Sequence, residues 1–314
     1  MLTFDETSSG VFIVSVTPFD ERGALDLAGV DRLVDFYLSK GVAGITILGM
    51  MGEAPKLSAS ESRIFVEAVC ARVGGAVPVV VGVSSPGFAS MQELTEAAMG
   101  AGASGVMVAP PATLRTDSQI VDYFRMTAET LGPVPFALQD FPLATGVQIA
   151  APILRTIADE IPTCVMLKHE DWPGLDKITA LRQAEAKGGR RISILVGNGG
   201  LFLPEELARG GDGAMTGFAY PEMMVQVCRL HAMGDTDAAS DLFDAYLPLV
   251  RYEQQPGIGL ATRKHVLHAR GVIASARIRR PGRALSGMET AEVERLIARQ
   301  ARRLDQLVRI EELS

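Results

Sequence analysis

The sequence predicts a (β/α)8 barrel followed by a C-terminal helical extension. Eight short apolar or β-branched runs alternate with stretches of helical spacing over about 220 of the 314 residues. A barrel of this kind typically takes about 250 residues. A doubly wound open sheet is the alternative, but no G-x-G-x-x-G opens a helix after the first predicted strand, as the common form of that fold requires.

The predicted strands are rich in valine and isoleucine, and each ends in a polar or glycine-rich loop. In chain order they are residues 11–16, 44–48, 79–82, 106–109, 136–138, 165–167, 192–196 and 213–215. Apolar side chains recur at helical spacing between them, for example in residues 27–39, 59–73, 91–101 and 119–131. This order of elements is the repeating unit of a parallel barrel.

From about residue 221 onward the pattern contains helices without intervening strands. These helices are predicted at residues 223–233, 235–250, 259–269 and 290–313. We therefore expect the barrel to comprise residues 1–222 and the extension to comprise residues 223–314, packed on the barrel. The segment 275–286 is basic and holds Pro281, which predicts an exposed connection; its arginines are Arg277, Arg279, Arg280 and Arg283.

Composition excludes several classes of protein. The chain is 47% hydrophobic and 21% charged, which is typical of a globular protein with a sizeable core. A net charge of -7 argues against a nucleic-acid partner. No run of about 18 apolar residues predicts a membrane span, and the N-terminus does not resemble a signal peptide. Cys70, Cys164 and Cys228 are far apart, which indicates reduced thiols and a cytoplasmic protein.

Lys168 is the first candidate for chemistry. It ends the apolar run 164–167 and is followed by His169 and Glu170. A lysine that leaves a buried strand at its carboxyl end emerges from an apolar wall, and burial disfavours the charged ammonium. A neutral amine is what attack on a carbonyl and formation of a Schiff base require. The alternative is a lysine whose stem packs on apolar surface while its head reaches water.

The loops after the predicted strands supply a set of polar groups. In barrel enzymes these loops form the active site, so we expect them to face a common cavity. The set lacks the ligands of a metal site, a G-x-S-x-G elbow and a Cys-His pair. A lysine with carboxylates and backbone donors suits covalent catalysis on a small 2-oxo acid. The loops contain Thr17-Pro18-Phe19, Gly49-Met50-Met51-Gly52-Glu53, Ser84-Ser85, Pro110-Pro111, Gln139-Asp140-Phe141-Pro142, Lys168-His169-Glu170, Gly197-Asn198-Gly199-Gly200 and Thr216-Gly217-Phe218.

These residues resemble the dihydrodipicolinate synthase and N-acetylneuraminate lyase family of Schiff-base barrels. The resemblance runs from about Gly10 to the C-terminus and rests on the motifs at residues 16–19, 49–53 and 213–217 and on Lys168. It implies that Lys168 forms an imine with pyruvate or a related 2-oxo acid. It also implies that Gly49, Met50, Met51 and Gly52 grip the substrate carboxylate, with Asn198 and Thr216 as further binding residues.

Departures from the family pattern concern the proton relay. Met50 and Met51 replace two threonines, so only backbone amides remain in that loop. Gln139 replaces a tyrosine, and a glutamine cannot act as an acid or base. The later tyrosine pair is replaced by Pro111 and Ala112. These changes argue against synthesis of dihydrodipicolinate.

A subgroup of the family, resembling L-2-keto-3-deoxyarabonate dehydratase, shows a similar pattern. It carries Gln-Asp in the tyrosine loop and K-x-E at the lysine strand, which here are Gln139-Asp140 and Lys168-His169-Glu170. By resemblance, Glu170 removes a proton from C3 of the imine and Gln139 orients the substrate. Residues two apart on a strand point the same way, so Lys168 and Glu170 can act together. A second glutamate of the subgroup falls here at Asn198 or Gly199.

Four neighbouring positions have structural interpretations as well. His169 is expected to point away from the cavity, and Glu53 to accept hydrogen bonds from loop amides. Met50 and Met51 are expected to form an apolar wall of the site, with adaptable core filling as the alternative. Trp172 either covers the cavity or packs on a helix.

The favoured hypothesis is a Schiff-base lyase, a dehydratase of a 2-keto-3-deoxy sugar acid. The alternatives are a pyruvate-dependent aldolase, a dihydrodipicolinate synthase-type condensation, and a non-catalytic relative that binds 2-oxo acids. We expect no cofactor other than the lysine imine, and no metal. The expected partners are a small-molecule 2-oxo acid and further copies of the chain in a tetramer or dimer, without nucleic acid or membrane.

Overall fold

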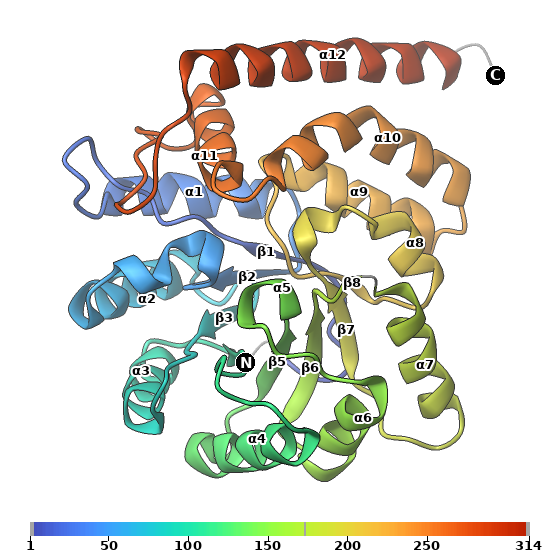
Figure 1. The fold of residues 1–314 in the computed structure, drawn as a ribbon. Helices are drawn as coiled ribbons and strands as arrows, with labels where there is room; N and C mark the ends of the chain where they lie inside the picture. The colour runs from blue at the N-terminus through green and yellow to red at the C-terminus, as the bar shows by residue number, and fades with distance from the viewer. Residues whose placement is uncertain (1–2, 173, 312–314) are drawn as a thin grey trace.

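The computed structural model describes residues 3–172 and 174–311, and it contains a closed barrel of parallel strands (Figure 1). Each strand pairs with the next in the chain, and β8 returns to β1. The predicted (β/α)8 class is therefore confirmed. The strands are β1 (Gly10–Val14), β2 (Gly44–Ile47), β3 (Val79–Gly82), β4 (Gly105–Val108), β5 (Phe136–Asp140), β6 (Cys164–His169), β7 (Ser193–Val196) and β8 (Gly213–Ala214).

Two strands run further toward the barrel mouth than predicted. Strand β5 continues to Asp140 and β6 to His169, so that Gln139 pairs with Lys168 and Asp140 with His169. Backbone pairing continues beyond β6, since the Glu170 amide donates to the Asp140 carbonyl at 2.8 Å. The candidate residues on these strands therefore sit on a hydrogen-bonded ladder rather than on free loops.

Helices surround the barrel (Figure 1). The predicted helices at 27–39 and 59–73 have those bounds, and α2 begins at a capping box formed by Ser58 and Glu61. Four later helices, α5 to α8, were not predicted individually. The helices up to the last strand are α1 (Leu27–Ser39), α2 (Ala59–Val73), α3 (Phe88–Gly100), α4 (Asp117–Leu131), α5 (Pro142–Thr145), α6 (Ala151–Glu160), α7 (Leu175–Ala186) and α8 (Leu203–Ala208), with 3-10 turns η1 (Met50–Gly52), η2 (Ala54–Lys56) and η3 (Asn198–Gly200).

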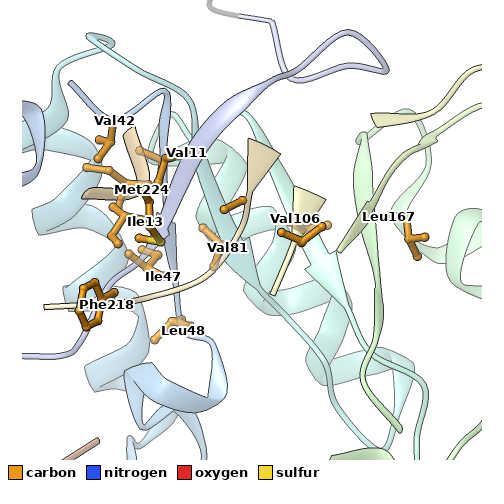
Figure 2. Packing of buried hydrophobic residues seen from close by; sticks show 14 of the residues in the cluster. Val11, Ile13, Val42, Ile47, Leu48, Val81, Val106, Leu167, Phe218 and Met224 are labelled. Carbon is orange, nitrogen blue, oxygen red and sulfur yellow. The ribbon is translucent and has the colours of Figure 1, made fainter. Parts of the chain in front are cut away.

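Apolar side chains form two cores. The larger one fills the layer between strands and helices, where Val11 and Ile13 of β1 lie near Met224 (Figure 2). The smaller one fills the barrel interior and includes Phe12, Val80, Met107 and Met166, with Met51 packed against it. The interior is thus packed, as is usual for this fold, and the open space lies at its ends.

The chain after β8 is helical, as predicted. Helix α9 (Pro221–Ala232) packs on β1, and α10 (Thr236–Glu253) packs on α9. Helix α11 (Gly259–Ala269) follows, and α12 (Gly287–Glu311) lies across α10 (Figure 1). The division of the chain at residue 222 remains a prediction. Within the described residues, no helix is both long and apolar enough to span a membrane.

The basic segment 275–286 has no helix or strand and is mostly exposed or half-buried, as its composition predicted; Arg277, Arg280 and Arg283 are exposed. Ser275 and Ile278 are buried in it. The Arg279 guanidinium lies over the Phe19 ring and pairs with Glu61, at 2.5 Å between Nη2 and Oε1. Arg279 differs from the other three arginines in being half-buried, because a carboxylate and an aromatic ring that are both distant in sequence contact it.

Candidate active site

Three candidate residues meet at the carboxyl end of β5 and β6. Lys168 Nζ lies 3.1 Å from Glu170 Oε2, and Gln139 Nε2 donates to the same oxygen at 2.6 Å. All three side chains are buried, with residue exposures of 4% for Lys168, 6% for Glu170 and 3% for Gln139. A carboxylate that is paired with an ammonium and accepts a hydrogen bond from an amide is held in place, within proton-transfer distance of the amine.

Gly197 makes room for the Glu170 side chain. A Cβ at Gly197 would overlap Cγ and Cδ of Glu170. The Gly197 amide donates to the His169 carbonyl at 2.8 Å, which continues the β6–β7 ladder past its last residues. The Asn198 side chain then donates to the Glu170 carbonyl at 3.1 Å. Asn198 therefore contacts the backbone of the lysine strand and supplies no carboxylate there.

Thr216 contacts the loop that carries Asn198. Its hydroxyl accepts from the Gly199 amide at 2.8 Å. The left-handed Gly199 leaves no space for a Cβ, because Gln254 from the end of α10 lies against it. The loop after β7 is thus held between the end of β8 and the helical extension.

The G-x-x-G-E loop lies next to the end of β1. The Thr17 hydroxyl donates to the Gly52 carbonyl at 2.5 Å, so the predicted T-P-F motif anchors this loop. Met51 packs on the barrel-interior core, which agrees with an apolar wall, whereas Met50 is 42% exposed. Within this loop only backbone groups at Gly49–Gly52 are polar.

Glu53 is a structural acceptor, as expected; one of its donors is a loop amide, as predicted, and the other two are lysine side chains. Its carboxylate is buried and accepts from Lys264 at 2.6 Å, from Lys56 at 2.9 Å and from the Arg279 amide at 3.0 Å. Sequence reasoning missed these partners because Lys264 and Arg279 lie more than 200 residues further along the chain.

His169 and Asp140 face the outside of the barrel wall. His169 is fully buried, and its Nε2 lies 3.0 Å from the Gly174 carbonyl. Asp140 pairs with Lys177 at 2.7 Å, and Lys177 also pairs with Asp171. His169 points away from Lys168 and Glu170, as alternation along a strand requires. Both residues stabilise the ends of β5 and β6 on the face of the sheet that points away from Lys168 and Glu170.

A cavity of about 770 Å³ lies over the barrel mouth. Met51, Trp172 and Asn198 line it from the barrel loops, and the stretch 253–257 lines it from the helical extension. Trp172 is 45% exposed and meets the Phe202 ring edge-on at 5.0 Å. Trp172 is therefore both a cavity wall and a packed side chain. The described residues that line the cavity do not include Lys168, Glu170 or Gln139; Asn198 lies between the cavity and this trio, because it lines the cavity and its side chain contacts the Glu170 backbone.

One buried carboxyl near the site was not predicted. Glu206 of α8 is 7% exposed, and burial, with smaller contributions from Glu205 and Glu170, raises its pKa to about 8. No signal in the sequence identified it, since it follows Glu205 in an ordinary helical turn. Among the residues that the structure describes, no cluster of three or more His, Cys, Asp or Glu side chains is arranged to hold a metal ion.

The fold is a parallel barrel with a buried lysine near the end of β6. Comparisons with known proteins identify the class of barrel lyases that has these features. The profile of the Dihydrodipicolinate synthetase family matches residues 7–300. The chain belongs to this family, and its named members are lyases.

Three relatives are informative. The chain is 32% identical over 304 residues to L-2-keto-3-deoxyarabonate dehydratase of Azospirillum brasilense, covering 95% of each protein. It is 48% identical to a crystal structure of dihydrodipicolinate synthase from Rhodopseudomonas palustris, with a TM-score of 0.93, covering 95% of this chain and 100% of that one. A prophage protein of the family from E. coli K12, solved in complex with pyruvate, is 25% identical with a TM-score of 0.84, covering 93% and 98% of the two chains.

Proposed function

We propose that the chain is a Schiff-base-forming lyase of 2-oxo acids, and that its reaction is the dehydration of a 2-keto-3-deoxy sugar acid. The observation that carries this proposal is the buried trio in which Glu170 contacts both Lys168 and Gln139. Similarity to the Azospirillum dehydratase over nearly the full length supports the choice of reaction.

In the proposed reaction the Lys168 amine attacks the 2-oxo carbon, and water leaves as the imine forms. The imine draws electrons from C3, so that Glu170 can remove a C3 proton. The resulting enamine expels the C4 hydroxyl, which leaves as water after taking up a proton. Hydrolysis of the imine then releases the dehydrated 2-oxo acid and restores the amine. The lysine imine itself supplies the electron sink, so the proposal includes no further cofactor.

The substrate carboxylate and its distal end would occupy different parts of the mouth. Backbone amides of Gly49–Gly52 would hold the carboxylate, since Met50 and Met51 offer no hydroxyl. Thr216 would contribute indirectly, because its hydroxyl accepts a hydrogen bond from the Gly199 amide and so holds the loop after β7. The distal carbons would extend into the cavity beside Met51, Asn198 and Trp172.

A second candidate is the condensation of pyruvate with an aldehyde, as in dihydrodipicolinate synthase. Similarity to the Rhodopseudomonas structure described by that name favours it. Gln139 opposes it, because this side chain occupies the position at which the family's tyrosine is expected and cannot relay a proton. A pyruvate-dependent aldolase uses the same imine and is distinguished by its products.

The proposal is tested by trapping and by product analysis. Incubation with pyruvate and borohydride should add one reduced pyruvyl group to the peptide that carries Lys168, and Lys168→Ala should abolish the label. A panel of 2-keto-3-deoxy acids should then yield a dehydrated product. If no 2-oxo acid labels the wild-type chain, the Schiff-base proposal is wrong. Efficient condensation of pyruvate with aspartate semialdehyde would show that the second candidate function, and not dehydration, is correct.

The proposed partners are the small 2-oxo acid and further copies of this chain. A homo-oligomer, tetramer or dimer, is part of the proposal and is tested by light scattering on the purified protein.

A further inference from the structure

Glu53 occupies an unusual position in the fold. It follows the 3-10 turn Met50–Gly52 directly, and its backbone is left-handed, with φ 58° and ψ 26°. Residues other than glycine rarely adopt this conformation, and they keep it only where their surroundings impose it. At Glu53 the carboxylate is surrounded by three donors, Lys264, Lys56 and the Arg279 amide.

The donors come from opposite ends of the chain. Lys56 lies three residues on, whereas Lys264 belongs to α11 and Arg279 to the segment after it. Lys264 Nζ also donates to the Arg277 carbonyl at 2.9 Å, and Lys56 Nζ donates to the Arg279 carbonyl at 2.9 Å. The carboxylate and two ammonium groups therefore bind the G-x-x-G turn to the C-terminal segment 277–279.

The same cluster encloses Phe19 of the T-P-F motif. Lys264 Nζ lies 4.4 Å from the centre of the Phe19 ring, and the Arg279 guanidinium lies 4.3 Å from it. The hydroxyl of Thr17, two residues before Phe19, donates to the Gly52 carbonyl at 2.5 Å. Both contacts therefore hold the carboxyl-terminal end of the turn 50–52, Thr17 through the Gly52 carbonyl and Glu53 through its own carboxylate.

We infer that Glu53 is a positioning residue, whose ion pair with Lys264 holds the amides of Gly49–Gly52 where they bind the carboxylate of a 2-oxo acid. The inference rests on the proposed function, because it needs the carboxylate to bind there. Glu53 itself is fully enclosed by its partners, with 0% of its side chain exposed. It therefore acts on substrate affinity through the loop.

Glu53→Gln keeps the side-chain volume and removes the charge. A misplacement of about 1 Å in a binding group can cost up to about 10²-fold. We therefore expect the pyruvate concentration for half-maximal borohydride labelling to rise about 10- to 100-fold, while labelling at saturation is retained. A variant that merely lost stability would show reduced labelling at every concentration of pyruvate.

Glu61→Gln is the matched control. Glu61 is also a carboxylate bound to Arg279, but its partner is the guanidinium, and its hydrogen bonds do not reach residues 49–52. Half-saturation should be unchanged in this variant. An equal shift in both variants, or a shift in neither, would overturn the inference. Absence of label in the wild type would instead overturn the proposed function, and the inference with it.

Lys264 provides a second readout that does not depend on the folding of Glu53→Gln. Burial lowers the pKa of Lys264 to about 8. The neighbouring cations Lys56 and Arg279 also lower it, whereas the Glu53 carboxylate raises it. Above pH 8 the ammonium loses its proton and the ion pair loses its cation. Half-saturation by pyruvate should therefore rise above pH 8 in the wild type more steeply than in Lys264→Met. Parallel profiles would contradict the inference.

Discussion

Replacing Glu170 by glutamine tests the proton transfer at the centre of the proposed reaction. In the wild type, Oε2 of Glu170 forms an ion pair with Lys168 at 3.1 Å and accepts a hydrogen bond from Gln139 at 2.6 Å. The amide oxygen of a glutamine can accept from both donors, so the shape of the site and most of its hydrogen bonding are retained. The change removes the ability to take up a proton.

The expected loss follows from that difference. A general base typically contributes 10²–10⁴-fold, which corresponds to about 2.7–5.4 kcal/mol of activation free energy. Gln139→Ala removes one hydrogen bond to the carboxylate, worth about 1.5–3 kcal/mol for a charged acceptor. We expect Glu170→Gln to lower turnover about 10²–10⁴-fold and Gln139→Ala to lower it less.

The assay compares two steps on the same proteins. Dehydration of the best substrate in a panel of 2-keto-3-deoxy acids gives turnover, and borohydride trapping with pyruvate reports imine formation. Trapping should be retained in Glu170→Gln, because the amine of Lys168 is still present. If Gln139→Ala proves the more damaging change, or if Glu170→Gln keeps turnover within about tenfold of the wild type, Glu170 is not the general base.

Two further outcomes follow from the geometry. Gly197→Ala places a methyl group where the Glu170 side chain lies, so turnover should fall as it does in Glu170→Gln. The circular dichroism spectrum should remain that of the wild type. Normal turnover would show that the Glu170 side chain is free to move. The pKa of Lys264 is about 8 in the folded state, against an ordinary value of 10.5. Between pH 8 and pH 10.5 the unfolded chain therefore binds more protons than the folded chain, so the free energy of unfolding rises with pH. This group contributes a rise on the order of 3 kcal/mol. Denaturant titrations should show this rise in the wild type and a smaller one in Lys264→Met; equal slopes would mean that Lys264 keeps its proton.

The barrel could be predicted because its signals are local. Valine-rich runs such as residues 79–82, and apolar side chains at helical spacing such as those in residues 59–73, are recognisable within a short stretch of sequence. Short helices such as α5 bury little of their own surface and carry no comparable period. The ends of β5 and β6 were predicted too early, because the polar side chains of Gln139 and Lys168 read as loop residues although they stay in the sheet.

The candidate site was predictable in part. Lys168, Glu170 and Gln139 could be brought together because they end adjacent parallel strands, and the structure has them in contact. The surroundings of Glu53 and the cavity wall at residues 253–257 depend on how the C-terminal helices dock. Docking is decided by contacts between residues that are far apart in sequence, which no local pattern encodes. Whether these residues perform the proposed chemistry remains a prediction.

The cavity over the barrel mouth has walls from two separate stretches of the chain. Met51, Trp172 and Asn198 come from the loops at the ends of the barrel strands, whereas Gln254 and Pro256 belong to the connection between α10 and α11. Lys168, on β6, and Glu170, which follows β6 directly, do not line this cavity. Substitutions in that connection can alter which molecules are accepted and leave the reacting groups untouched. Under the proposed function, relatives could therefore differ in substrate through changes in this connection, with Lys168, Glu170 and Gln139 left as they are.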